Sequence, residues 1–143
     1  MDAAERGSAP LEFLIASVAL FVPLVALAVT VTDITTASFA ATAAARQGVR
    51  AFARAESVPA GQQRIAQVSE LALADYGLAP QTAQWDITCT SSPCLRRGNL
   101  VTVNFTLNVP LRFIPSLPGI AVPPLITVSR SATARVSLTS VNR

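Results

Sequence analysis

Apolar residues follow one another almost without interruption near the N-terminus. Between Leu11 and Val31 the one ionisable side chain is that of Glu12. A helix of about 20 residues, rising about 1.5 Å per residue, is long enough to cross a hydrocarbon core of about 30 Å. The pattern therefore predicts a transmembrane helix with a carboxylate at its beginning. A carboxylate at bilayer depth costs roughly 2.5 to 3.5 kcal/mol, so Glu12 needs a compensating interaction.

Two other kinds of apolar segment are alternatives to a transmembrane helix. The apolar core of a cleaved secretory signal has only about 7 to 15 residues and ends at a small-residue cleavage site, whereas this run is longer. A core helix of a soluble protein must be covered on every side, and a chain of 143 residues offers little material for that. The transmembrane interpretation is therefore preferred to both.

A helical pattern continues beyond the apolar run. Residues 33–57 are rich in alanine and contain no proline. One helix is therefore expected to continue until Val58-Pro59 ends it, because the residue before a proline disfavours the helical conformation. The whole rod would be roughly 70 Å long.

The extension has two distinct faces. Arg46, Arg50 and Arg54 are four residues apart and share one face. That face is expected to be solvated, with contact to lipid headgroups or to a protein partner as the alternatives. The other face is apolar and needs a packing partner, and it consists of Ala41, Ala45, Val49 and Phe52.

A second, shorter helix is predicted after a break. Residues 57–63, with a proline and a glycine, are expected to interrupt the helical structure. Residues 63–77 then carry apolar side chains at helical spacing, and Gly77 is placed as a C-terminal cap. The apolar face of this amphipathic helix consists of Ile65, Val68, Ala72 and Tyr76.

Beyond this helix the apolar period changes to two, which is typical of half-buried strands. Alternation is clear in residues 83–90, 100–109 and 126–138, with Arg130 as an exception within an apolar register. Arg130 is either a device that protects a sheet edge or the partner of a carboxylate. The predicted fold is α+β: a long N-terminal transmembrane helix continues into a small domain with a second helix and a three- to four-stranded antiparallel sheet.

Residues 110–124, between the last two predicted strands, contain five prolines and several large apolar side chains. Such a segment is a poor solvated linker. It is expected to pack on its own domain, with a neighbouring subunit as the alternative.

Composition argues against several classes of function. All eleven basic residues are arginine, there is no histidine, and the formal net charge is +3. The arginines form no dense block, so nucleic-acid binding is not expected. Without histidine a catalytic triad lacks its usual base, and Glu70, Asp75 and Asp86 show no spacing typical of a carboxylate pair. The protein is therefore predicted not to be an enzyme and to need no cofactor.

Cys89 and Cys94 are the two cysteines of the chain. Two sulfurs cannot supply the four ligands of a structural zinc site, and their spacing is not the redox CxxC pattern, so no metal site is predicted. A disulfide across this short loop is the preferred interpretation, with free thiols as the alternative. A disulfide indicates an oxidising compartment outside the cytosol.

The N-terminal sequence resembles a known family. A short charged leader, "MDAAERG", precedes "SAPLEFLIASVALF", in which Gly7 is followed after four residues by Glu12 and Phe13. This arrangement is similar to the prepilin-peptidase site of type IV pilins and pseudopilins. The apolar helix, its Ala/Arg-rich continuation and the late alternating strands around a proline-rich loop resemble the TadE-like proteins of tight-adherence (Tad) pilus systems. The resemblance covers most of the chain.

The resemblance implies a non-catalytic structural role. A TadE-like protein would be a minor pilin or pseudopilin of a surface fibre used in adhesion. Prepilin peptidase would cut between Gly7 and Ser8, and Glu12, with Phe13 beside it, would set the register of the N-terminal helix among other pilus subunits. There the carboxylate would pair with a neighbouring subunit's terminal amine, which would offset its desolvation.

The expected organisation is a leader at residues 1–7, a transmembrane helix with its extension at 8–57, and an extracytoplasmic domain at 58–143. The location is the cell membrane, with a single pass, the N-terminus cytoplasmic before processing, and a place in the fibre as a further expectation. The positive-inside rule alone favours the reverse orientation, because Arg46 and Arg50 follow the helix. The alternative function is a single-pass membrane protein whose exterior domain binds or scaffolds a partner, with no leader processing.

Overall fold

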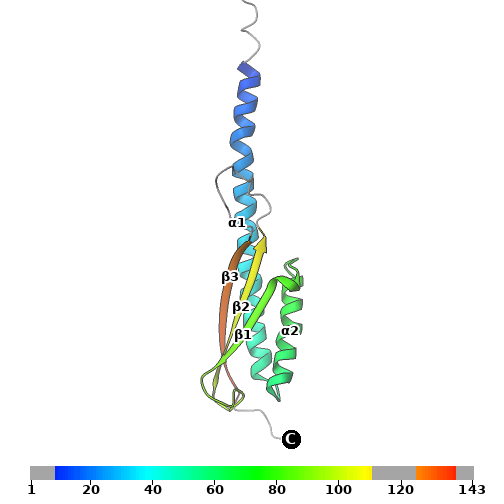
Figure 1. The fold of residues 1–143 in the computed structure, drawn as a ribbon, viewed down its shortest axis with the longest axis vertical. Helices are drawn as coiled ribbons and strands as arrows, with labels where there is room; N and C mark the ends of the chain where they lie inside the picture. The colour runs from blue at the N-terminus through cyan, green and yellow to red at the C-terminus, as the bar shows by residue number, and fades with distance from the viewer. Residues whose placement is uncertain (1–8, 111–124, 138–143) are drawn as a thin grey trace, which may run out of the picture.

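A computed structural model describes residues 9–110 and 125–137 of the chain. It confirms the α+β class (Figure 1). Two helices, α1 and α2, precede a short 3-10 turn and an antiparallel sheet of three strands in the order β1-β2-β3. The elements are α1 Ala9–Ala53, α2 Val58–Ala74, η1 Pro80–Thr82, β1 Ala83–Cys89, β2 Leu100–Pro110 and β3 Leu125–Arg135.

Helix α1 divides into two parts with different surroundings. Residues 9–32, here called the free segment, extend away from the domain, whereas residues 37–53, the docked segment, lie against the sheet and α2 (Figure 1). The predicted apolar face of the docked segment is confirmed as buried. It is wider than predicted, because the buried set is Ala37, Ala40, Ala41, Ala44, Ala45, Gly48, Val49, Phe52 and Ala53.

The predicted end of α1 and the predicted break after it are wrong. Helix α1 ends at Ala53 rather than at the Val58-Pro59 pair, and residues 58–63 form the beginning of α2 rather than an interruption. Ser57 is the N-cap of α2, and its hydroxyl accepts a hydrogen bond from the Ala60 N–H at 3.3 Å. Proline fits the first helical turn, where its missing N–H needs no partner, so Pro59 starts a helix here instead of ending one.

Gly61 allows the two helices to approach each other closely. A Cβ atom at this position would lie 2.5 Å from Cδ2 of Phe52, and Phe52 is fully buried. The glycine that the sequence pattern assigned to a break therefore makes room for an aromatic ring between α1 and α2. The two helices pack side by side on the same face of the sheet (Figure 1).

The predicted cap at the C-terminal end of α2 is confirmed. Gly77 has a φ of 67°, in the left-handed region that glycine adopts most readily. The Leu78 N–H then donates to the Leu73 carbonyl at 3.0 Å, the bond expected when a glycine ends a helix. The predicted apolar face is confirmed at Ile65 and Ala72, while Val68 is only half-buried and Tyr76 is exposed.

Strand β2 lies at the centre of the sheet and supplies most of its core. Its odd-numbered residues are buried against the helices, and Phe105 pairs with Trp85 on β1 and Arg130 on β3. Beyond β3, Val136 is buried, but it follows the end of the strand at Arg135. Of the proline-rich segment predicted to pack on the domain, residues 110–124, Pro110 ends β2 and residues 111–124 lie outside the described residues. The buried side chains of β2 are Val101, Val103, Phe105, Leu107 and Val109.

The opposite face of the sheet is polar and hydrogen-bonded across strands. The Thr102 and Thr133 hydroxyls are 2.8 Å apart, and the Asn104 amide donates to the Asp86 carboxylate at 3.1 Å. Such cross-strand pairs fix the register of an antiparallel sheet. The alternation read from the sequence therefore separates one helix-covered face from one exposed polar face.

Candidate functional site

The carboxylate of Glu12 lies in the first turn of α1. Its side chain is exposed, as is that of Phe13, which is 75% accessible. An acidic group in the first turn interacts favourably with the helix dipole. Gly7 and Ser8, the predicted processing residues, lie outside the described residues together with the rest of the leader.

The free segment has the length and composition of a membrane-spanning helix. None of its most apolar stretch is buried by the rest of the protein. A core helix of a soluble protein would be covered, so that alternative does not describe this segment. The hydroxyls of Thr30 and Thr32 donate to carbonyls four residues earlier, at 2.8 and 2.9 Å, which satisfies them within the helix. These features are compatible with a single-pass membrane protein.

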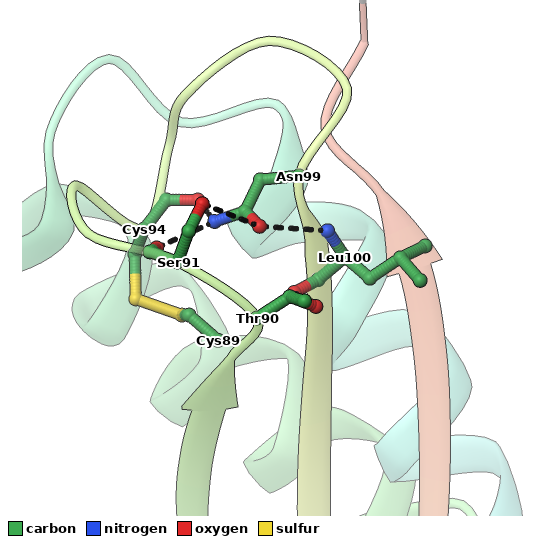
Figure 2. The surroundings of a disulfide bond; sticks show 6 residues. All are labelled: Cys89, Thr90, Ser91, Cys94, Asn99 and Leu100. Atoms are coloured by element: carbon green, nitrogen blue, oxygen red, sulfur yellow. Dashed lines mark hydrogen bonds between the residues drawn. A yellow bond between two sulfur atoms is a disulfide. The ribbon is translucent and has the colours of Figure 1, made fainter.

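The cysteines form the predicted disulfide. The Cys89–Cys94 Cα atoms are 5.4 Å apart, within the range usual for disulfides, and the bond joins the end of β1 to the loop that leads to β2 (Figure 2). The Thr90 N–H donates to the Leu100 carbonyl at 3.0 Å just beyond the bridge. The hairpin end is thus held by a covalent bond and by a backbone hydrogen bond.

Asn99 holds the same loop from within, a position that was not among the predicted site residues. Its side-chain amide donates to the carbonyls of Ser91 at 2.7 Å and Cys94 at 3.0 Å. Its side-chain oxygen accepts from the Leu100 N–H at 3.1 Å (Figure 2). The one available signal was its place after Gly98, because Gly-Asn pairs are common in turns.

Of the two alternatives for Arg130, the structure supports a residue at the edge of the sheet. Its guanidinium donates to the Ser129 carbonyl at 2.9 Å and to the Ser38 hydroxyl of α1. No carboxylate takes part in these bonds, so the ion-pair alternative is not what the structure shows. Arg130 joins the edge of β3 to the docked segment.

The arginine face of α1 is exposed, as predicted for a solvated face. Arg46 and Arg50 line an open hollow of about 290 Å³ together with residues 131–134 of β3. Arg50 and Arg54 line a second hollow of about 330 Å³ with Arg135. Because Arg50 and Ala134 line both, the two hollows adjoin each other.

The candidate acids of the sequence analysis are not brought together. Asp86 lies on the polar face of the sheet and accepts from Asn104, whereas Glu70 and Asp75 lie on or just after α2, beside the opposite face. Within residues 9–110 and 125–137, no group of three histidine, cysteine or acidic side chains is placed to hold a metal ion. The three candidate acids therefore do not form a carboxylate pair.

Comparisons with protein-family models, with curated proteins and with solved structures gave no match to this chain.

Proposed function

We propose that this protein is a minor pilin or pseudopilin-like structural subunit in the assembly of a Tad-type pilus. It would be anchored in the membrane by the free segment of α1 and joined to other pilus subunits through the same helix after assembly. The observation that carries the proposal is that one continuous 45-residue helix combines an apolar part that the protein does not bury with a part built into a domain core.

A continuous helix of this kind suits a subunit that changes its surroundings. The free segment presents large apolar side chains on all sides, among them Phe13, Phe21 and Leu27. These side chains can face lipid in the membrane and other helices in a fibre without any change in the domain. The docked segment keeps the domain fixed to the helix, because its buried face is part of the same core as the sheet.

In this proposal the Glu12 carboxylate gains a partner that offsets the free energy of its desolvation. If the leader is removed after Gly7, the new amine belongs to Ser8, four residues before Glu12 in the sequence. An exposed carboxylate in the first turn is accessible to the amine of a neighbouring subunit. Pairing offsets the desolvation of both groups only in the correct register, so the pair would discriminate against misaligned subunits.

The proposed topology places the domain outside the cytoplasm. A prepilin peptidase acts on a leader at the cytoplasmic side, and the Cys89–Cys94 disulfide needs an oxidising compartment. The partners in this proposal are the peptidase, other pilus subunits and the membrane, and no nucleic acid or cofactor is involved.

The deciding experiment is the mass of the intact N-terminal peptide, from native membranes with and without the prepilin peptidase. A peptide that begins at Ser8 and disappears when the peptidase is absent is expected. A peptide that still begins at Met1 in both samples would contradict the proposal. It would favour an anchored protein whose exterior domain scaffolds a partner.

A variant tests the function of the carboxylate separately. Glu12→Ala should leave the protein membrane-bound and folded but reduce its recovery in sheared pili at least tenfold. Glu56→Ala removes an exposed carboxylate from the domain and should be incorporated normally. Normal recovery of Glu12→Ala, with equal amounts in the membrane, would show that Glu12 does not direct assembly.

A further inference from the structure

One edge of β3 is open along its C-terminal half. The Val136 N–H donates to the Asn99 carbonyl, so even-numbered residues direct their backbone groups toward β2. Backbone groups alternate in direction along a strand, so Ser131, Thr133 and Arg135 point theirs away from β2. No further strand pairs with this edge in the part of the chain that the structure describes.

Arg130 marks where the open edge begins. By the same alternation the Ser129 carbonyl also points outward, and the Arg130 guanidinium occupies it while donating to Ser38 on α1. A charged side chain folded over a strand edge is a common protection against unwanted pairing. The edge is therefore covered at Ser129 and left open from residue 131 onward.

An arginine row follows the open edge. Arg46, Arg50 and Arg54 form one wall and residues 131–135 of β3 form the other, and we call this groove the basic trough. Among the described residues, no carboxylate pairs with these three guanidinium groups. The trough also lies at the end of the domain remote from the free segment, where the end of α1, the start of α2, the β1–β2 loop and the end of β3 meet (Figure 1). This end of the domain is basic, because among its described residues Glu56 is the one acidic residue beside seven arginines. The arginines are Arg46, Arg50, Arg54, Arg64, Arg96, Arg97 and Arg135.

The spacing of the arginines matches that of an added strand. Residues four apart on a helix are about 6 Å apart along its axis, and alternate residues of a strand are about 6.6 to 6.8 Å apart. The docked segment and β3 run alongside each other (Figure 1). Every second side chain of a strand added to β3 would face the helix side of the sheet, with one acidic group for each arginine.

We propose that the basic trough binds an extended acidic segment of another protein, which adds as a fourth strand beside β3. The backbone of residues 131–135 would supply the hydrogen bonds, and Arg46, Arg50 and Arg54 would pair with acidic side chains at alternate positions of the segment. Such a partner would bind whether or not the chain joins a fibre.

Other occupants fit the trough less well. A second copy pairing edge to edge would bring two arginine rows together, and like charges oppose such a contact. Lipid headgroups are out of reach, because Arg46 lies 15 residues beyond Val31, or about 22 Å along the helix. Nucleic acid would neutralise the arginines, but its phosphates are acceptors only and cannot pair with the outward carbonyls of a strand edge.

Binding can be measured with the full chain in phosphatidylcholine nanodiscs and fluorescein-labelled peptides. The probe is an eight-residue peptide in which Glu and Thr alternate. A peptide of the same composition with four consecutive Glu keeps the charge but loses the spacing, and a Gln/Thr peptide loses the charge. The alternating acidic peptide should bind saturably, with affinity at least fivefold above the block peptide and tenfold above the neutral one. Equal binding of the two acidic peptides would overturn strand addition.

Matched variants separate the backbone from the charge. Ser131→Pro removes one outward N–H without removing a ladder bond and should weaken binding at least tenfold, whereas Ser131→Ala keeps the N–H and should bind as the parent. Arg50→Glu, in both hollows, should weaken binding at least tenfold. Arg96→Glu makes the same charge change outside the trough and should change binding less than twofold. Equal losses in the two arginine variants would show an effect of net charge alone and overturn the site.

Hydrogen exchange provides a measurement that needs no variant. Peptide binding to the parent chain should slow amide exchange of Ser131, Thr133 and Arg135 at least fivefold, with smaller changes at the covered end of β3. Unchanged exchange at saturating peptide would contradict strand addition even if Ser131→Pro failed to fold. Self-association of the chain without peptide, abolished by Ser131→Pro, would identify a second copy as the occupant and refute the acidic partner.

Discussion

Residues 9–32 and 37–53 belong to the same helix, yet the domain buries none of the first set and one whole face of the second. The free segment is rich in Leu, Val and Phe, whereas the buried face of the docked segment is mostly alanine. Larger side chains are thus exposed and smaller ones are buried. That order is the reverse of the usual one for a soluble protein, in which exposed large apolar side chains are scattered singly.

The difference shows how a helix meets two environments. Against the sheet, the large side chains come from the partner, with Phe105 and Leu107 filling the space over the alanines. Small residues let the helix axis approach the sheet, so bulk on both sides would not fit. In the free segment no protein partner is present, and bulk on all sides suits lipid or a ring of other helices.

The largest expected effect on stability distinguishes a phenylalanine of the docked segment from one of the free segment. Phe52→Ala should lower the free energy of unfolding by about 3 to 5 kcal/mol, because the ring is fully buried between α1, α2 and β2. Phe13→Ala should leave it nearly unchanged, since Phe13 contributes nothing to the domain core. Denaturant titration of the detergent-solubilised chain, followed by the fluorescence of Trp85, would measure both. Similar losses in the two variants would mean that the free segment also stabilises the domain.

Substitutions at two glycines test the packing of α1 against α2. Gly61→Ala should destabilise the domain by about 1 to 3 kcal/mol, because the new methyl group would overlap the Phe52 ring. Gly48→Ala is the control: its Cβ would lie 3.5 Å from Ile65, an ordinary contact, and alanine favours a helix by about 1 kcal/mol. Opposite signs in the same unfolding assay are expected, and a stabilising Gly61→Ala would show that the ring has room to move.

The disulfide tests a part of the domain that is remote from the free segment. Replacing Cys89 and Cys94 together by alanine should cost about 2 kcal/mol, the chain-entropy value for so short a loop. Circular dichroism in detergent should show the helical signal of the free segment unchanged below the unfolding transition. Loss of that helical signal would mean that the two regions are not independent.

The smallest expected effect on stability concerns the N-cap of α2, which follows the docked segment. Ser57→Ala removes the cap of α2 and should cost about 1 kcal/mol, whereas Ser57→Asp should retain most of the stability. The difference in unfolding midpoint between the two variants isolates the hydrogen bond to Ala60. Equal stability of both would mean that the chain turns at residues 54–57 without help from the cap.

Local patterns predicted most of the fold. The apolar run, the alanine face from Ala41 to Phe52, the cap at Gly77 and the disulfide follow from periodicity and short-range chemistry, and the structure confirms each. The end of α1 could not be predicted from the same rules, because Pro59 is as compatible with a helix start as with a helix end. Ser57 was available as a capping signal, and the packing of Gly61 on Phe52 adds a contact between helices that the local sequence does not show.

Some residues of the candidate site could be recognised from the sequence, and others could not. Glu12 stands out in the sequence because it is the one ionisable residue of the apolar run. In the structure it is exposed in the first turn of α1. Asn99 gave no comparable signal, since its partners Ser91 and Cys94 are brought to it by the loop. Arg130 was recognisable as an exception, but its contact with Ser38 joins residues 92 positions apart.

The sequence by itself determined that a long helix, a second helix and three strands follow one another, that each has an apolar face, and that the first helix is long and apolar enough to cross a membrane. These properties depend on neighbours within a few positions along the chain. Only the tertiary structure decided where α1 turns into α2, which strand edge stays open, and that the arginines of α1 line it. Those outcomes depend on contacts between different elements, such as Phe52 of α1 with Gly61 of α2 and Arg50 of α1 with Ala134 of β3, which no local pattern records.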